Sequence, residues 1–111
     1  MMTPNLLKCL LGDAENKLRE ILGEKLKRIT LYGSYARGDF NEESDIDIIA
    51  LIDGDEKRFQ RQIVRLNVDL SLLYDVETSI MLVKKETFNT NADLIPLFRN
   101  IESEGVNIYA V

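Results

Sequence analysis

The sequence predicts an α+β fold of the α/β two-layer kind, in which three to four β-strands are flanked by helices. The first observation is that apolar residues recur every three or four positions over 13–26 and 59–73, which is the period of a helix. The second is that short runs rich in β-branched residues lie between and after these segments. The third is size: 111 residues, 45% of them hydrophobic, are typical of one domain with one core. We therefore expect a single domain over residues 1–111.

Each predicted helix has a recognisable start or end. Asp13 is a plausible N-cap for the helix over 13–26, and the turn signal Asp53-Gly54-Asp55 precedes the helix over 59–73. A last helix is expected to begin near Asp93 or Pro96 and to end at Gly105.

Four segments have the composition of strands. Three are expected at residues 27–32, 45–52 and 76–83, and residues 106–111 could close as a fourth strand at the edge of the sheet. The predicted chain thus alternates helices and strands, with a polar loop between the first two strands.

Composition excludes several classes of protein. The 14 Lys and Arg residues against 19 Asp and Glu give a net charge of −5, which argues against binding nucleic acid by charge neutralisation. Cys9 has no partner for a disulfide, and the chain has no histidine to complete a zinc site, so a reducing cytoplasm is the expected compartment. Apolar runs such as 48–52 are far shorter than the roughly 20 residues that span a bilayer, so no membrane association is expected.

Two aspartates on one predicted strand form a candidate metal site. Asp45 and Asp47 are two positions apart, so their side chains leave the same face of the strand, with Cα atoms about 6.5–7 Å apart. Two carboxylates this close repel each other unless a cation lies between them. Oxygen ligands without a nearby histidine or thiolate favour magnesium or manganese. A lone pair of this kind is more often a solvated strand face, so the neighbouring motif decides the interpretation.

A Gly-Ser turn lies ten residues before this pair. Gly33 lets the backbone approach a phosphate closely, and Ser34 presents its hydroxyl and backbone N–H groups at the start of a helix. Arg37, one helical turn further on, could also contact phosphate. Because magnesium usually completes its ligand shell with substrate phosphates, the two motifs together predict a magnesium-bound nucleoside triphosphate.

Gly33-Ser34, followed after ten residues by Asp45-Ile46-Asp47 and with an apolar strand before each, resembles the signature of polymerase-β-type nucleotidyltransferases. Arg37, Gly38 and Ser44 fit the minimal bacterial and archaeal branch of that family, and the closing segment 104–109 is also similar to it.

The resemblance implies a polymerase-β-like nucleotidyltransferase fold with a mixed sheet. It implies that Asp45 and Asp47 hold Mg²⁺ (or Mn²⁺) as catalytic ligands, and that Gly33 and Ser34 hold the β- and γ-phosphates. Arg37 and Ser44 are the further candidates for nucleotide binding. Metal ions between such carboxylates lower the charge on the attacked α-phosphate and stabilise the departing pyrophosphate.

Active members of the family carry a third carboxylate on the next strand, and here three residues compete for that position. Asp69 has the expected apolar neighbours but lies inside the predicted helix 59–73. Glu77 and Ser79 share one face of the third predicted strand, and of these only Glu77 could bind a metal strongly. We take Glu77 as the third catalytic candidate. If Ser79 is the true equivalent, the site is one carboxylate short.

The expected function is transfer of a nucleoside monophosphate, AMP from ATP in the first instance, to an acceptor. Once the sheet and its helices are counted, little chain remains for an acceptor-binding domain, so the acceptor is expected on another chain. Minimal proteins of this branch resemble antitoxins whose partner is a small helical HEPN-type toxin, which suggests a partner protein of that kind. The alternative is a catalytically degenerate module that binds its partner without chemistry.

Overall fold

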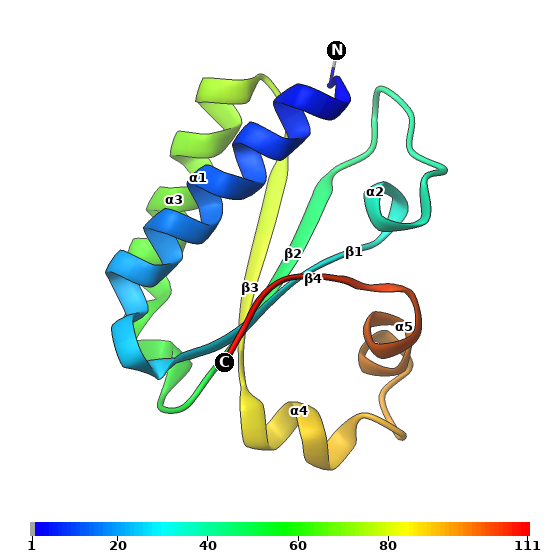
Figure 1. Cartoon of the computed structure of the whole chain (residues 1–111). Helices are drawn as coiled ribbons and strands as arrows, with labels where there is room; N and C mark the ends of the chain where they lie inside the picture. Colours follow the sequence, from blue (N-terminus) through cyan, green and yellow to red (C-terminus); the bar gives the residue numbers. More distant parts are fainter. Residues whose placement is uncertain (1) are drawn as a thin grey trace.

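The computed structural model describes residues 2–111, which form one four-stranded sheet with helices on both faces (Figure 1). The helices, in chain order, are α1 (Pro4–Leu22), α2 (Ser34–Arg37), α3 (Gln60–Tyr74), α4 (Lys85–Asn91) and α5 (Pro96–Glu104). The strands are β1 (Leu26–Tyr32), β2 (Ile46–Ile52), β3 (Thr78–Lys84) and β4 (Val106–Ala110). Short 3₁₀ turns at Gly23–Lys25 and Glu56–Phe59 join α1 to β1 and lead into α3.

The sheet is mixed, as the resemblance implies. The strand order is β3-β2-β1-β4; β1 runs antiparallel to β2 and β4, and β2 runs parallel to β3. The fold class and the four strands are therefore confirmed. The register places Asp47 between Tyr32 of β1 and Ser79 of β3.

One face of the sheet is covered by α1 and α3 (Figure 1). Alternate residues of β2 point to this face, because successive side chains of a strand alternate. They pack on the apolar stripes of the two helices, and all of the following are buried: Leu10, Ala14, Leu18, Leu22, Ile46, Ile48, Ala50, Ile52, Ile63, Leu66 and Leu70. This is the larger of two hydrophobic clusters.

The opposite face is covered by α4 and α5 and carries a smaller apolar cluster. Its members include Ile49 and Leu51 of β2, Phe88 of α4, and Phe98 and Ile101 of α5. Asp47, which is two residues before Ile49 on β2, points to this same face. The candidate site therefore lies on the less apolar side of the sheet.

The first helix differs from its prediction at both ends. It begins at Pro4 instead of near Asp13, because the Thr3 hydroxyl accepts a 3.1 Å hydrogen bond from the Leu6 N–H and proline occupies the first helical turn. It ends at Leu22, and Leu26 already belongs to β1. Thr3 and Pro4 set the start of this helix, so Asp13 lies inside it and does not cap it.

Later boundaries are closer to prediction. Helix α3 and strand β1 match their predicted ranges to within one residue, and α5 begins at Pro96, one of the two predicted starts. Strand β3 begins at Thr78, two residues later than predicted, and the short helix α4 was missed. Gly105 caps α5 as predicted; a Cβ there would lie 2.5 Å from Cγ2 of Thr30, so only glycine lets the helix end against β1. None of the helices in residues 2–111 has the length and hydropathy needed to span a membrane.

Candidate active site

The turn from β1 into α2 brings the backbone against an acidic side chain. Gly33 has φ +77° and lies so close to Asp47 that a Cβ at this position would be 2.5 Å from its Oδ2. Only glycine satisfies both the positive φ and the close approach. Ser34 then opens the one-turn helix α2, whose first N–H groups have no partner within the helix. The predicted Gly-Ser turn and the predicted aspartate are thus in direct contact.

Asp47 lies in an electrostatically unfavourable position in the free protein. Its partial burial, and secondly the nearby charge of Asp45, raise its pKa, and Arg37 opposes this shift. Burial and the charge of Asp47 in turn raise the pKa of Tyr32, its neighbour on β1. The site therefore has an excess of negative charge, which a bound cation would relieve.

Glu77 lies beside Asp45 at the start of the parallel strand pair. The N–H of Ile46 donates a 2.9 Å hydrogen bond to the carbonyl of Glu77, which aligns the residues just before β2 and β3. A hydrogen bond to Asp45, together with the charge of that aspartate, raises the pKa of the exposed Glu77 side chain. Two of the predicted catalytic carboxylates are therefore adjacent, although Glu77 precedes β3 instead of lying within it.

The other two candidates for the third carboxylate are separated by the fold. Ser79 pairs directly with Asp47 in the register of β2 and β3, so it occupies the strand position beside this aspartate. Asp69 is exposed on α3, on the opposite side of the sheet from Asp47. The helical interpretation of Asp69 is correct, and this residue takes no part in the site.

A cleft of about 350 Å³ lies between α2 and α5. One wall is formed by residues around the Gly-Ser turn, and the other by residues of α5. The lining residues are Tyr32, Gly33, Ser34, Arg37, Asp47, Leu97, Asn100, Ile101 and Glu104. Three of the four predicted nucleotide-binding residues and one of the two aspartates thus share one cleft.

Arg37 connects the two walls of this cleft. Its guanidinium forms ion pairs with Asp39 (3.2 Å) in the following loop and with Glu104 (3.4 Å) at the end of α5. Both pairs are solvent-exposed, and such pairs contribute about 0–1 kcal/mol each, so an incoming phosphate can replace them. In the free protein Arg37 is therefore held at the mouth of the cleft.

Ser44 lies outside the cleft and braces the loop before Asp45. Its hydroxyl accepts a 2.9 Å hydrogen bond from the Asn41 N–H, and its own N–H donates to the Asn41 carbonyl at 3.1 Å. Phe40 in the same loop stacks on Tyr35 of α2, with ring centroids 4.2 Å apart. The structure gives Ser44 a role in shaping the loop that leads into the aspartate pair.

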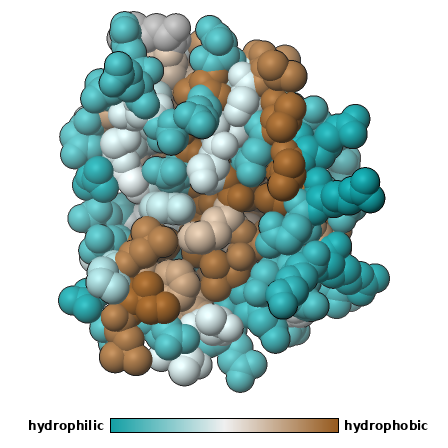
Figure 2. Space-filling view, turned by 180° about the vertical axis from the view of Figure 1, so that it is seen from behind, coloured by the Kyte–Doolittle hydropathy of each residue, from teal (hydrophilic) through white to brown (hydrophobic). Residues whose placement is uncertain are grey.

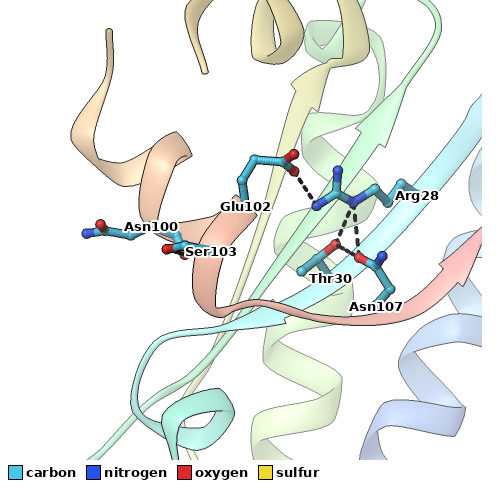
Figure 3. A network of polar contacts seen from close by, with 6 residues as sticks. All are labelled: Arg28, Thr30, Asn100, Glu102, Ser103 and Asn107. Carbon is cyan, nitrogen blue, oxygen red and sulfur yellow. Dashed lines mark hydrogen bonds and ion pairs between the residues drawn. The ribbon is translucent and has the colours of Figure 1, made fainter. Parts of the chain in front are cut away.

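The α5 wall is fixed to the sheet by a polar network, shown in Figure 3. Arg28 of β1 forms a 2.6 Å ion pair with Glu102 of α5, and its Nε donates to Thr30 and Asn107 at 2.9 and 3.1 Å. The buried Thr30 hydroxyl donates to Asn107 at 2.9 Å. In Figure 3, Asn100 points away from this network on the other side of α5. The network thereby anchors the helix whose opposite side lines the cleft.

The residues of α5 that line the cleft were missed by the sequence analysis. Asn100 and Leu97 are distant from the Gly-Ser motif in sequence, and no local pattern reports that tertiary contact. Glu104 had one signal, since the segment 104–109 is similar to the minimal branch of the family. Tyr32 had another, because it directly precedes Gly33.

The donor set of this structure fits a divalent cation. Asp47 in β2 and Asp45 just before this strand would offer hard oxygen ligands, and the pKa of Asp47 is raised in a way that a cation would reverse. Among residues 2–111, no group of three or more histidine, cysteine or acidic side chains is arranged to hold a metal ion. Asp45 and Asp47 are the residues that would hold such an ion, and phosphate oxygens and water would fill its remaining positions, as magnesium commonly requires.

Comparison with known proteins assigns the chain to a family. The family model for the nucleotidyltransferase domain matches residues 15–106. Two curated proteins of Methanocaldococcus jannaschii, each named “putative protein adenylyltransferase”, are 31% and 36% identical to the chain. These alignments cover 89% and 85% of the chain and 95% and 89% of the two relatives. The chain belongs to the nucleotidyltransferase domain family, as its sequence motifs indicated.

Solved structures share the fold at lower identity. A structure titled “putative minimal nucleotidyltransferase” matches with a TM-score of 0.64 at 23% identity, covering 95% of both chains. A toxin–antitoxin structure with AMP-PNP gives 0.64 at 20% identity, covering 91% of this chain and 73% of the other. A complex of a tri-AMPylated HEPN toxin with an MNT antitoxin from Shewanella oneidensis gives 0.59 at 18% identity, covering 94% and 72%.

Proposed function

We propose that residues 1–111 form a single magnesium-dependent nucleotidyltransferase domain that transfers AMP from ATP to a hydroxyl group of a partner protein. The observation that carries this proposal is the close approach of the Gly33-Ser34 turn to Asp47 in the lining of the cleft. A phosphate-binding turn and a metal-binding carboxylate are useful together only if the ligand is a metal-bound polyphosphate.

Each residue of the cleft has a distinct task in this reaction. Gly33 and Ser34 bind the β- and γ-phosphates through backbone N–H groups and the serine hydroxyl, and Arg37 exchanges its carboxylate partners for phosphate oxygens. Asp45 and Asp47 hold the magnesium, which supplies charge stabilisation at the α-phosphate and at the leaving pyrophosphate.

The transfer exchanges one bond at the α-phosphorus for another. The acceptor oxygen bonds to the α-phosphorus as the bond to the bridging oxygen of the β-phosphate breaks, and pyrophosphate leaves in line. The acceptor's proton passes to a carboxylate at the site. Glu77 is the group we assign to this step, because it lies just before β3 and beside the residues that lead into β2, next to Asp45.

A protein acceptor is favoured by an apolar patch at the rim of the cleft. Leu94, Ile95 and Leu97, at the junction of α4 and α5, are exposed, and Leu97 also lines the cleft. In Figure 2 hydrophobic atoms gather at this junction, at the lower left. Exposed apolar patches beside a site mark protein-binding surfaces more often than sites for small polar acceptors. The partner we propose is a HEPN-type toxin, as in the Shewanella oneidensis complex, with this chain as the antitoxin.

A second function is favoured by Ser79, which pairs with Asp47 on β3 where a carboxylate would complete a three-acid site. In this alternative the domain binds nucleotide weakly or not at all and neutralises its partner by contact alone.

Labelled transfer distinguishes the two functions. The purified protein is incubated with α-labelled ATP and magnesium, with and without lysate of its own cell, and compared with Asp45→Asn. Asp53→Asn is the matched control, since Asp53 is exposed just beyond the other end of β2. A labelled protein band that needs Asp45 and survives the control supports the transferase. Partner binding retained by Asp45→Asn, with no label transferred by any variant, supports the contact-only module.

A further inference from the structure

Helix α3 carries a second apolar stripe on its solvent side. Its inner stripe, Ile63, Leu66 and Leu70, is buried against the sheet. Figure 2 shows a further column of hydrophobic atoms along this helix, at the upper right. The side chains exposed there are Val64 (60%), Val68 (49%), Leu72 (79%) and Leu73 (69%). The hydrophobic core requires only one apolar face of α3. A second apolar face on the solvent side therefore indicates a surface that another molecule covers.

The charges along this stripe are divided between its two ends. Arg61 and Arg65 lie in the N-terminal half of α3, and Asp69 and Asp75 lie at or after its C-terminal half. None of the four forms an ion pair with any other group of residues 2–111. Val68 is at the midpoint between Arg61 and Asp75, so the stripe reads basic, apolar, acidic about a central valine.

This order of charges along α3 is complementary to that of a second copy of the helix that runs in the opposite direction. In two antiparallel copies of α3 that cross near Val68, Arg61 of one copy lies level with Asp75 of the other. Arg65 and Asp69 are about 4.5 Å and 1.5 Å from the crossing point at 1.5 Å per residue, so across the pair they are about 3 Å apart along the axis. A long arginine side chain spans that offset easily. Parallel packing would instead place like charges together.

The surface beside the stripe is hollowed. A groove of about 980 Å³ lies between α1 and α3 and is lined by Val64, Val68 and Leu73 together with Ile21 of α1. The ridge of one copy can therefore enter the groove of the other, and the same contact repeats in reverse, as a two-fold interface requires.

We propose that the outer face of α3, with the groove toward α1, binds a second copy of this chain in an antiparallel, two-fold arrangement. The interface lies on the opposite side of the sheet from Asp47, so both clefts stay open in the dimer. Helix α3 is about 22 Å long at 15 residues, and one helix pair with its flanks gives an interface at the small end of the stable range. Self-association is therefore expected to be weak and concentration-dependent, with a Kd on the order of micromolar.

Sedimentation velocity over a concentration series tests this interface. The wild-type chain is expected to shift from monomer toward dimer as its concentration rises, and Val68→Asp is expected to raise the Kd at least tenfold. Leu94→Asp is the matched control, because Leu94 is as exposed as the stripe but lies on the α4 and α5 side. Circular dichroism must show that both variants are folded. A wild-type chain that remains monomeric at several hundred micromolar, or equal weakening by both variants, overturns the proposal.

Charge reversal identifies the occupant as a second copy. Arg65→Glu alone and Asp69→Lys alone each place like charges across the proposed interface and are expected to weaken the dimer. The double variant restores opposite charges between copies, so its Kd is expected to return toward wild type. A double variant as weak as the sum of the two single variants rules out the antiparallel pairing. The readout is independent of nucleotide transfer, so its outcome does not depend on the proposed function.

Discussion

The two faces of the sheet differ in chemistry and, we infer, in purpose. The face under α1 and α3 is filled by buried aliphatic side chains from the sheet and from both helices. The face under α4 and α5 has a cluster of five buried residues, and around it lie Asp47, Tyr32 and the Arg28 network. The same strand supplies both: Ile46, Ile48 and Ala50 point one way, and Asp47 and Ile49 point the other.

This division separates stability from chemistry. Apolar burial stabilises the fold by about 25 cal/mol per Å², and most of it lies on the α1 and α3 side. Charged groups held close together, such as Asp45 and Asp47, oppose folding slightly and are tolerated because the other face compensates. Substitutions on the two faces should therefore fall into two classes: those that lower stability and those that lower activity.

The largest effect is expected from Asp47→Asn. If this carboxylate holds the metal, AMP transfer should fall by about 1,000-fold, as when other groups that stabilise a transition state are removed. Unfolding in urea should show a free energy unchanged or slightly higher at neutral pH, because burial and Asp45 already disfavour the charged form. Asp53→Asn should change neither quantity. Equal losses of activity and stability would break the proposed separation.

Leu18→Ala should act in the opposite way. Leu18 of α1 is fully buried in the larger cluster, so its truncation should lower the free energy of unfolding by about 2–5 kcal/mol. Transfer activity per folded molecule should stay within twofold of wild type. Leu6→Ala, on the exposed side of the same helix, should change stability by less than about 0.5 kcal/mol. A specific loss of activity in folded Leu18→Ala would show that the two faces are coupled.

Thr30→Val should affect both stability and activity, because the Thr30 network is part of the fold and also anchors α5 at the cleft. Its buried hydroxyl bonds both Arg28 and Asn107, so the isosteric valine should cost about 1–3 kcal/mol by removing two hydrogen bonds of the network. Because the network anchors α5, the KM for the nucleotide should rise more than kcat falls. Thr87→Val, on the exposed side of α4, is the control. An unchanged KM would mean that the network supports the fold but not the cleft.

The sequence was informative where a local pattern carries the signal. The Gly33-Ser34 turn and the Asp45-Asp47 pair depend on backbone conformation and strand alternation. The structure places Gly33 against Asp47 of β2, whereas Asp45 lies just before that strand. The four strands and α3 have clear periods for the same reason.

The remaining features depend on contacts that no short window contains. The α5 wall of the cleft is more than fifty residues from the Gly-Ser turn in sequence, so Asn100 had no local signal. Ser44 fits the family motif, yet its hydroxyl is used by Asn41 in the loop. The apolar repeat that predicts α1 is clear only from Asp13 onward, whereas the Thr3 cap makes the helix begin earlier, at Pro4. Register between β2 and β3, which pairs Asp47 with Ser79, is likewise a tertiary property.

The smallest effect is expected at a polar contact within the otherwise apolar layer of α1 and α3. The Tyr74 hydroxyl donates a hydrogen bond to Asp13, and this bond, aided by burial and the aspartate's charge, raises the pKa of Tyr74 from 10.0 to about 12. Tyr74→Phe should lower the free energy of unfolding by about 0.5–1.5 kcal/mol at neutral pH. Because the folded pKa is raised, this contribution is fully present below pH 10 and is lost as the pH rises toward 12. The free energies of unfolding of the wild type and Tyr74→Phe, measured in urea from pH 8 to 12, should therefore converge as the pH rises.

A double-mutant cycle of Tyr74→Phe with Asp13→Ala tests the same hydrogen bond. The single variant should lose a similar amount of stability to Tyr74→Phe, and the double variant should lose little more than either, since both remove one bond. Additive losses, or a stability difference that persists at pH 12, would show that the contact does not join α1 to α3 in solution. Transfer activity should be unchanged in all three variants, because Asp13 and Tyr74 lie on the apolar side of the sheet, away from Asp47. The Tyr74–Asp13 contact should therefore affect stability without affecting activity, as expected for a contact on the α1 and α3 side of the sheet.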